Sequence, residues 1–306
     1  MRNAFASEIT ALAATDPTLI MMTADIGNRL FDRFKDQFPD RLFNCGVAEA
    51  NMIGMAAGLA SGGFRPICYT ITPFITYRCY EQIRVDVCYH QKPVTIVGTG
   101  SGLSYASLGV THHSCEDIAV MRVLPGMTVL CPADAFEVRA LLRASRLWNG
   151  PVYMRIGKKG EPTVHASTPE LTIGKALPIR SGSEVALLST GNMLPSAMET
   201  AGLLAQKGVS CEVVSFHTVK PLDEDYLRSA FSKFKLVATL EEHSILGGLG
   251  GSVAEWLADG DGPRARMIRL GTGDHFLHTA GEQEFAREHY GLTPAKISEA
   301  ILSRLN

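Results

Sequence analysis

The sequence predicts an α/β protein built from two open, mostly parallel sheets. Short, continuous apolar runs recur along the 306 residues, helical stretches separate them, and one polar segment divides them into two series. Strands that are apolar throughout and joined by helices are typical of parallel sheets covered on both faces. A chain of this length also suits two domains of roughly 150 residues better than a single core.

The first series alternates strands with helices and predicts an open α/β sandwich. The expected strands are residues 19–23, 65–69, 94–99, 128–131 and 152–156. The expected helices are residues 3–14, 49–60, 76–89, 118–122 and 135–146.

The second series follows a polar stretch, residues 158–172, that is rich in Gly, Pro, Ser and Thr and is typical of an exposed connection. We therefore expect a first domain over residues 1–160, a linker over 161–175 and a second domain over 176–306. The expected strands of the second domain are residues 185–189, 210–215, 236–240 and 266–270. Its expected helices are residues 194–207, 222–231, 251–257 and 294–305.

Composition excludes several classes of protein. The formal net charge of -2 argues against a general nucleic-acid binder, which normally carries a basic imbalance. No apolar run is long enough to span a bilayer, and the N-terminal residues lack the pattern of a secretory signal, so a cytoplasmic protein is expected. The 7 cysteines are scattered without a Cys-x-x-Cys pair, which indicates reduced, packed thiols and no metal site of this kind.

The first candidate for chemistry is Glu49, in residues 44–51 (NCGVAEAN) at the mouth of an apolar, Gly- and Ala-rich helix. Burying an unpaired acid costs free energy, so a partner that exchanges its proton is expected. The segment resembles the glutamate motif of thiamine diphosphate enzymes of the transketolase family, in which this carboxyl group protonates the pyrimidine ring of the cofactor. The alternative is a glutamate favoured by the helix dipole alone.

A second segment, residues 73–84 (PFITYRCYEQIR), follows a predicted strand. It is similar to the family segment whose aromatic side chains flank the cofactor's pyrimidine. This resemblance assigns the stacking position to Phe74, with Tyr77 as a second candidate, because flat rings gain from offset stacking. Both could instead be core aromatic residues.

A third pair of segments, residues 98–105 (GTGSGLSY) and 108–117 (LGVTHHSCED), resembles the family loop that brings a histidine to the cofactor and substrate. His112 takes the matched place, and an imidazole suits the task because it titrates near neutrality and can donate to a developing alkoxide. His113 is as well explained by a structural role.

The chain departs from the family pattern at two positions. Sugar-phosphate transketolases carry an aspartate that reads a hydroxyl group where this chain has Leu108, and a phosphate-contacting histidine where it has Gly100. Arg155 does match a family arginine that follows the last strand of the domain, and its fork of donors suits a phosphate or sulfonate. The usual sugar-phosphate specificity is therefore not implied.

Three other sites have competing interpretations. Asp25 matches a family aspartate at the end of the first strand, where α/β sheets place ligands, but a helix-capping role explains it equally well. The glycine-rich loop at residues 247–251 could cradle a phosphate, although we favour packing. The segment at residues 259–263 (DGDGP) is a predicted turn and not a metal site.

The resemblance implies the C-terminal half of a split transketolase that moves a two-carbon ketol unit from a ketose to an aldehyde. Apart from the predicted turn at residues 259–263, no segment offers the family's Gly-Asp-Gly pattern. An N-terminal diphosphate-binding subunit would therefore hold the cofactor diphosphate and Mg2+, or Ca2+ or Mn2+, in an α2β2 assembly. This chain alone should be inactive. One alternative is a subunit like 1-deoxyxylulose-phosphate synthase or the β-type subunit of 2-oxo-acid dehydrogenases. Another is a non-catalytic α/β scaffold.

Overall fold

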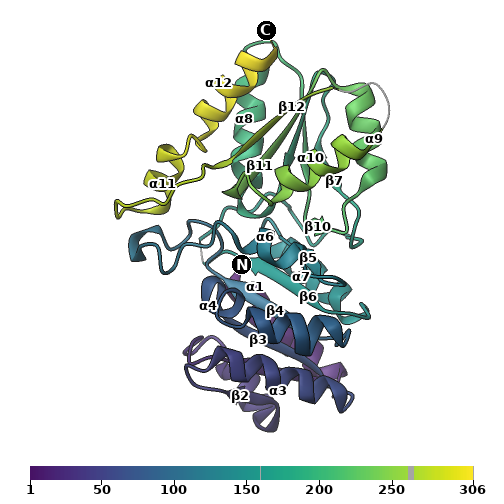
Figure 1. Cartoon of the computed structure of the whole chain (residues 1–306), viewed down its shortest axis with the longest axis vertical. Helices are drawn as coiled ribbons and strands as arrows, with labels where there is room; N and C mark the ends of the chain where they lie inside the picture. The colour runs from purple at the N-terminus through teal and green to yellow at the C-terminus, as the bar shows by residue number, and fades with distance from the viewer. Residues whose placement is uncertain (159, 261–264, 306) are drawn as a thin grey trace.

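A seven-stranded sheet lies at the centre of the lower half of the computed structural model, which describes residues 1–158, 160–260 and 265–305 (Figure 1). The strands run in the order β10-β5-β6-β4-β3-β1-β2, and all neighbours are parallel except β10 and β5. They are β1 (Leu19–Thr23), β2 (Leu42–Asn44), β3 (Arg65–Ile71), β4 (Thr95–Thr99), β5 (Thr128–Leu130), β6 (Val152–Ile156) and β10 (Thr218–Lys220).

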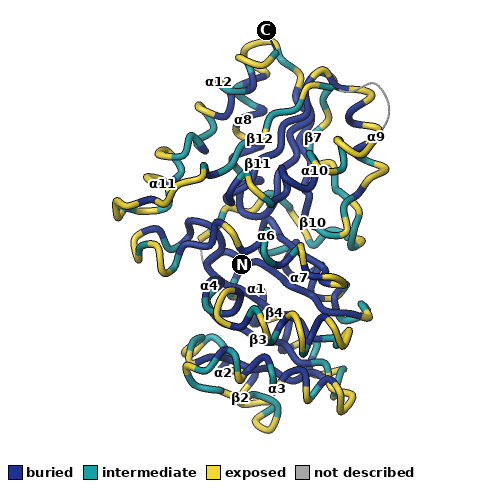
Figure 2. The backbone as a smooth tube through the Cα atoms, in the orientation of Figure 1, coloured by how far each residue is buried: buried dark blue, intermediate teal, exposed yellow. Residues whose placement is uncertain are grey.

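Helices cover both faces of this sheet, and the strands between them are largely buried, except for the edge strand β2 (Figure 2). One face packs against α1 (Arg2–Thr15), α2 (Asp32–Gln37) and α7 (Ala135–Arg146). The other face packs against α3 (Glu49–Ser61), α4 (Thr72–Thr76), α5 (Tyr80–Gln82), the π-helix η2 (Ile83–Tyr89) and α6 (Asp117–Arg122).

A second sheet, of five strands within the described residues, forms the upper half of the molecule in the order β12-β11-β8-β9-β7. Its strands are β7 (Leu177–Arg180), β8 (Val185–Ser189), β9 (Cys211–Ser215), β11 (Leu236–Ser244) and β12 (Arg266–Thr272). The helices around it are α8 (Leu194–Gln206), α9 (Glu224–Lys233), α10 (Leu249–Asp259), α11 (Gln283–His289) and α12 (Pro294–Leu305). The predicted class, two mostly parallel α/β sheets, is confirmed.

The two halves share both a core and a sheet. One apolar cluster runs from the α3 face of the first sheet to α9 and α10 of the second. The strand β10, from the range predicted as the second domain, pairs antiparallel with β5 and completes the first sheet. The prediction missed β2, β7 and β10 because each is only three or four residues long and lies at a sheet edge.

The predicted continuous helix over residues 76–89 is wrong. Pro73 in the first turn starts a helix earlier, at Thr72, and that helix ends at Thr76. The chain resumes as α5 and continues as a π-helix from Ile83 to Tyr89. The pattern of apolar residues does not reveal the break between α4 and α5, because the buried residues before and after the break lie on the same side of the segment.

Within the described ranges, we find neither a helix of the length and apolarity needed to cross a bilayer nor a metal-type group of three His, Cys, Asp or Glu side chains. The predicted turn at residues 259–263 begins where α10 ends at Asp259. Its residues 261–263 lie outside the part of the chain that the structure describes.

Candidate functional site

Except for Arg155, which lies within β6, the predicted site residues come from segments that follow the carboxyl ends of parallel strands, the edge at which open α/β sheets bind ligands. Glu49 is the first residue of α3 and is only 4% exposed. Its ion-pair partner within the described part of the chain is Arg78, whose Nη1 lies 3.5 Å from the Glu49 Oε1. The Arg78 side chain is about half exposed, so this ion pair contributes little to stability and can give way to an incoming ligand.

Three aromatic rings follow one another in a series that Arg78 connects to this carboxyl group. The rings of Phe74 and His112 meet edge to face with centroids 5.2 Å apart, and the Tyr105 ring centre lies 6.1 Å from that of His112. The Arg78 guanidinium lies 4.3 Å from the Phe74 ring centre, which joins the cluster to Glu49. We call Glu49, Phe74, Arg78, Tyr105 and His112 the edge cluster.

The surroundings of His112 favour its neutral form. Burial lowers its pKa, and the neighbouring His113 and the positive charge of Arg78 lower it further. The Thr111 hydroxyl lies 2.9 Å from the His112 Nδ1. If that hydroxyl donates to Nδ1, the proton of the neutral imidazole lies on Nε2, available to an oxygen of a substrate. His113 instead bonds the Ala106 carbonyl, which supports its structural interpretation.

Tyr77 and Asp25 lie outside the edge cluster. The Tyr77 hydroxyl donates to the Glu116 carboxylate at 2.9 Å, and burial together with the charges of Asp117 and Glu116 raises the pKa of Tyr77. Asp25 is exposed and has a positive φ of 52°. It exchanges hydrogen bonds of about 3 Å with Asn44, at the start of the Glu49 motif. The next helix along the chain, α2, has Phe31 and not Asp25 as its N-cap.

Arg155 does not face an open site. Its side chain is 1% exposed, and Nε and Nη2 donate to the Asp117 carboxylate at 2.8 and 3.1 Å. Nη2 also donates to the carbonyls of Ser114 and Glu242, and the remaining Nη1 is buried as well. The predicted phosphate- or sulfonate-binding role of Arg155 therefore finds no support in the structure, because its fork of donors already holds a buried carboxylate.

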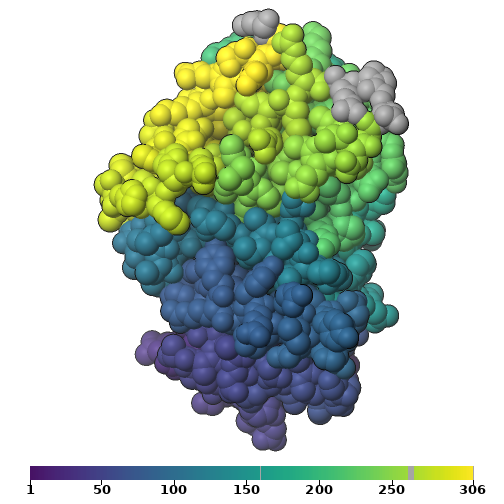
Figure 3. Space-filling view, in the orientation of Figure 1, coloured from purple at the N-terminus to yellow at the C-terminus, as the bar shows by residue number. Residues whose placement is uncertain are grey.

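A second buried carboxylate, Glu242 of β11, fixes the loop that leads to His112. It accepts hydrogen bonds from the Leu103 backbone at 2.8 Å and from Gln283 and Arg287 of α11 at 2.9 and 2.6 Å. Figure 3 shows the yellow-green α11 region resting on the blue-teal loop. The second half of the chain thus positions part of the site in the first half.

The two departures from the family pattern differ in their surroundings. Leu108 is 54% exposed, at the end of the short 3-10 turn η3 (Ala106–Leu108). Gly100 is buried with a φ of +79°, and a Cβ atom built on it would lie 1.9 Å from the Tyr105 ring. No side chain fits at position 100 while Tyr105 keeps its place.

The glycine-rich loop at residues 247–251 does not present a free helix N-terminus. The Glu241 carboxylate accepts hydrogen bonds from the Leu249 and Gly250 backbones at 2.7 and 2.8 Å. Burial nevertheless raises the pKa of Glu241 to about 7. The amides that could cradle a phosphate are occupied by the protein itself, which supports the packing interpretation.

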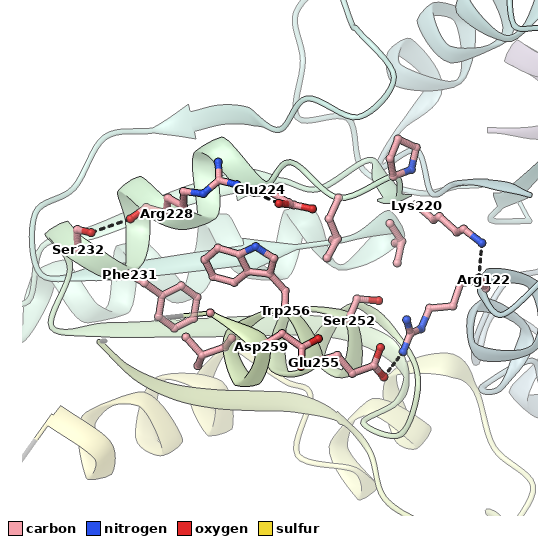
Figure 4. A pocket seen from close by; sticks show the side chains of 15 residues that line it. Arg122, Lys220, Glu224, Arg228, Phe231, Ser232, Ser252, Glu255, Trp256 and Asp259 are labelled. Atoms are coloured by element: carbon pink, nitrogen blue, oxygen red, sulfur yellow. Dashed lines mark hydrogen bonds and ion pairs between the residues drawn. The ribbon is translucent and has the colours of Figure 1, made fainter. Parts of the chain in front are cut away.

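A groove of about 940 Å³ lies away from the edge cluster, between α9, α10 and the end of α6 (Figure 4). Phe231 and Trp256 form its apolar wall. Its cations have partners already: Arg122 pairs with Glu255, and the Lys220 ammonium donates to two backbone carbonyls at 2.7 Å. We assign no chemistry to this groove, because its cations are already engaged by the protein.

Sequence reasoning missed Arg78 and Tyr105 as members of the site. Arg78 was part of the quoted 73–84 segment, but a cation within a helix-like pattern gave no signal of its own. Tyr105 is the last residue of the 98–105 segment, but only its tertiary contacts with Gly100 and His112 distinguish it from a surface tyrosine.

Family models match most of the chain. The transketolase pyrimidine-binding domain matches residues 1–161, and the transketolase C-terminal domain matches residues 174–297.

Individual proteins match over nearly the whole chain. A putative transketolase C-terminal section of Methanocaldococcus jannaschii is 34% identical over 100% of this chain and 96% of its own length. The 6-deoxy-6-sulfo-D-fructose transketolase subunit SqwH of Clostridium sp. (strain MSTE9) is 36% identical over 98% of this chain and 92% of its own length. A solved structure described as a split gene transketolase, inactive beta4 tetramer, superposes with a TM-score of 0.90 at 34% identity, covering 99% of this chain and 97% of that one.

Proposed function

The chain belongs to the transketolase family, and from this membership and the edge cluster we propose that it is the pyrimidine-binding subunit of a split transketolase. The complete enzyme transfers a two-carbon ketol unit from a ketose donor to an aldehyde acceptor, with thiamine diphosphate as cofactor. The observation that carries the proposal is the Glu49 carboxyl group, buried at the start of α3 and paired with a half-exposed arginine among the described residues.

The residues present fit the pyrimidine end of this cofactor. An aminopyrimidine needs an acid at one ring nitrogen and an apolar surface against its face, which Glu49 and the half-buried Phe74 ring offer side by side with Arg78. When bound, the cofactor supplies a nucleophilic thiazolium carbon. Glu49 holds and exchanges a proton at its carboxyl oxygen, a role that contributes on the order of 10² to 10⁴-fold in rate.

His112 acts on the substrate side. Its neutral imidazole, in edge-to-face contact with the Phe74 and Tyr105 rings, donates to the substrate oxygen on which charge develops. Asp25 stands with Asn44 beside the Glu49 motif and is proposed as a secondary cofactor contact. Tyr77 keeps its proposed place near the cofactor through its bond to Glu116.

We further propose an N-terminal, diphosphate-binding partner subunit that holds the cofactor diphosphate and Mg2+, in an α2β2 assembly. The donor is an acidic ketose, since the similar SqwH protein is named for a sulfonated one. The domain limits 1–160 and 176–306 remain our proposal for the two units. All 7 cysteines are free, which supports a reducing, cytoplasmic location.

The test is reconstitution with the product of the adjacent gene, followed by a ketol-transfer assay with thiamine diphosphate and magnesium. Transfer that requires both chains supports the proposal. Release of carbon dioxide from pyruvate in place of ketol transfer would identify a 1-deoxyxylulose-phosphate synthase-like or 2-oxo-acid dehydrogenase-like enzyme. A chain that neither recruits a partner nor responds to the cofactor would be a scaffold.

The role of Glu49 is tested by Glu49→Gln in the reconstituted enzyme. An amide cannot exchange the required proton, so we expect at least about a 100-fold loss of turnover with little change in melting temperature. Glu81→Gln, the same substitution at an exposed position of α5, is the matched control and should retain full activity. Near-normal turnover of the Glu49 variant would remove the residue from the mechanism.

A further inference from the structure

We propose that Tyr105 and Lys158 form the subsite for the acidic end group, phosphate or sulfonate, of the donor ketose. This inference rests on the proposed transketolase function and concerns its substrate. It begins from the burial of Arg155, which leaves the acidic group without its expected partner.

The Tyr105 ring packs against the backbone of Gly100. It lies so close that a Cβ atom there would sit 1.9 Å from the Tyr105 Cε2. The preceding loop is fixed by the bond from the Leu103 backbone to Glu242. The Tyr105 ring therefore occupies the position at the carboxyl end of β4 that a side chain of residue 100 would otherwise fill.

Two cations accompany this ring. The Lys158 ammonium lies 5.7 Å from the Tyr105 ring centre, just beyond the carboxyl end of β6. Arg2 donates to the Tyr69 hydroxyl at 3.1 Å. Although burial opposes it, Arg2 has a raised pKa, and Tyr69 and Tyr105 are the groups that raise it. Neither cation forms an ion pair with a carboxylate among the described residues, and the Lys158 ammonium is available to an anion.

The Tyr105 ring also contacts His112, the proposed substrate-side donor. Tyr105 meets the His112 ring at 82° with centroids 6.1 Å apart. A donor whose reacting oxygen lies at His112 would extend past Tyr105 toward Lys158. A phenol hydroxyl and an ammonium group donate hydrogen bonds to a phosphate or sulfonate, and the charge-assisted bond from the ammonium is the stronger of the two.

The test uses the reconstituted enzyme and three donors with one carbon skeleton: fructose 6-phosphate, 6-deoxy-6-sulfofructose and fructose. In Lys158→Met we expect KM to rise about tenfold or more for the two acidic donors, with kcat nearly unchanged and with the fructose parameters unaffected. Tyr105→Phe, which keeps the ring on Gly100, should raise the same KM values severalfold. Lys35→Met, at an exposed position of α2, is the control. The difference between phosphate and sulfonate donors identifies which acid the subsite prefers.

Direct binding separates this inference from the proposed function. Inorganic phosphate and methanesulfonate are titrated into the full-length wild-type, Lys158→Met and Lys35→Met chains by calorimetry. Anion binding that depends on Lys158, in a protein without ketol transfer, would support the subsite and refute the transketolase proposal. Transfer with KM values for acidic donors that Lys158→Met leaves unchanged would refute the subsite. Loss of activity toward fructose as well would indicate a structural role and would also overturn it.

Discussion

Replacing Asp117 with asparagine removes the charge that balances Arg155 in the interior. The two side chains are 0% and 1% exposed, and the Asp117 carboxylate also accepts a hydrogen bond from the Tyr153 hydroxyl at 2.5 Å. The amide oxygen of the introduced asparagine can still accept from Tyr153, because it replaces one carboxylate oxygen. The substitution therefore keeps the shape of the side chain, but it removes the charge and replaces the oxygen that accepts from Arg155 Nη2 with an amide NH2 group.

The expected cost is large because it leaves an unbalanced guanidinium in the core. Removing one partner of a buried ion pair typically destabilises a protein by about 3–5 kcal/mol. Native domains have a stability of about 5–15 kcal/mol. The Asp117→Asn variant should therefore unfold at a much lower urea concentration than the wild type, because the charge it removes balances a guanidinium that cannot reach water.

The assay is urea unfolding followed by tryptophan fluorescence. The two tryptophans pack against different core clusters: Trp148 against the α1 face of the first sheet, and Trp256, on α10, against the cluster shared by the two halves. Both should report the loss, since Arg155 also bonds the Glu242 carbonyl of the second half. Arg228→Ala, which breaks exposed ion pairs on α9, is the control and should cost less than about 1 kcal/mol.

A double-mutant cycle completes the experiment. The double variant Asp117→Asn with Arg155→Met buries no net charge, so its loss should be smaller than the sum of the two single losses. The reasoning fails if Asp117→Asn costs no more than the Arg228 control, or if the single losses add. An Arg155→Met variant of normal stability but with a raised KM for acidic donors would restore Arg155 as a substrate ligand.

Three further substitutions have separate outcomes. Burial raises the pKa of Glu241 to about 7, so the folded state binds this proton more tightly than the unfolded state. The free energy of unfolding of the wild type should therefore fall by on the order of 3 kcal/mol as pH rises from about 4.5 to 7. Between about pH 5 and 8, the urea midpoint of Glu241→Gln should change less with pH than that of the wild type, and equal changes would contradict the burial effect. Gly202 lies inside α8 with open space at its Cβ position, so Gly202→Ala should stabilise by about 0.5–1 kcal/mol in the same assay, and a loss would mean unseen crowding. Leu108→Asp at an exposed position should change the ranking of donor ketoses without changing stability, and an unchanged ranking would show that this position does not read the donor.

The scaffold could be predicted because its signals are local. Strands β1, β6 and β8 have the predicted bounds, and α3 begins at Glu49 as expected. Apolar runs and helix starts depend on residues within one or two turns of each other. The short edge strands β2, β7 and β10 could not be predicted, since their pairing depends on which strand lies beside them in space.

The segments that form the candidate site could be predicted, but the contacts between their side chains could not. The sequence named Glu49, Phe74 and His112, and the structure places the last two in ring contact. Arg78 and Tyr105 join them only through folding. The roles of all these residues in chemistry remain predictions until the reconstituted enzyme is assayed.

The sequence by itself determined the α/β class, the strands other than β2, β7 and β10, and the segments that form the candidate site. Only the tertiary structure decided which hydrogen-bond and ion-pair partners each polar group has. Arg155 donates hydrogen bonds to Asp117, 38 residues away in the sequence, and to the Glu242 carbonyl, 87 residues away. With these partners, an arginine expected to bind a ligand instead holds parts of the protein together. The physical reason is that the role of a buried charged side chain depends on the groups that replace its hydration water, and in this fold those groups belong to distant parts of the chain.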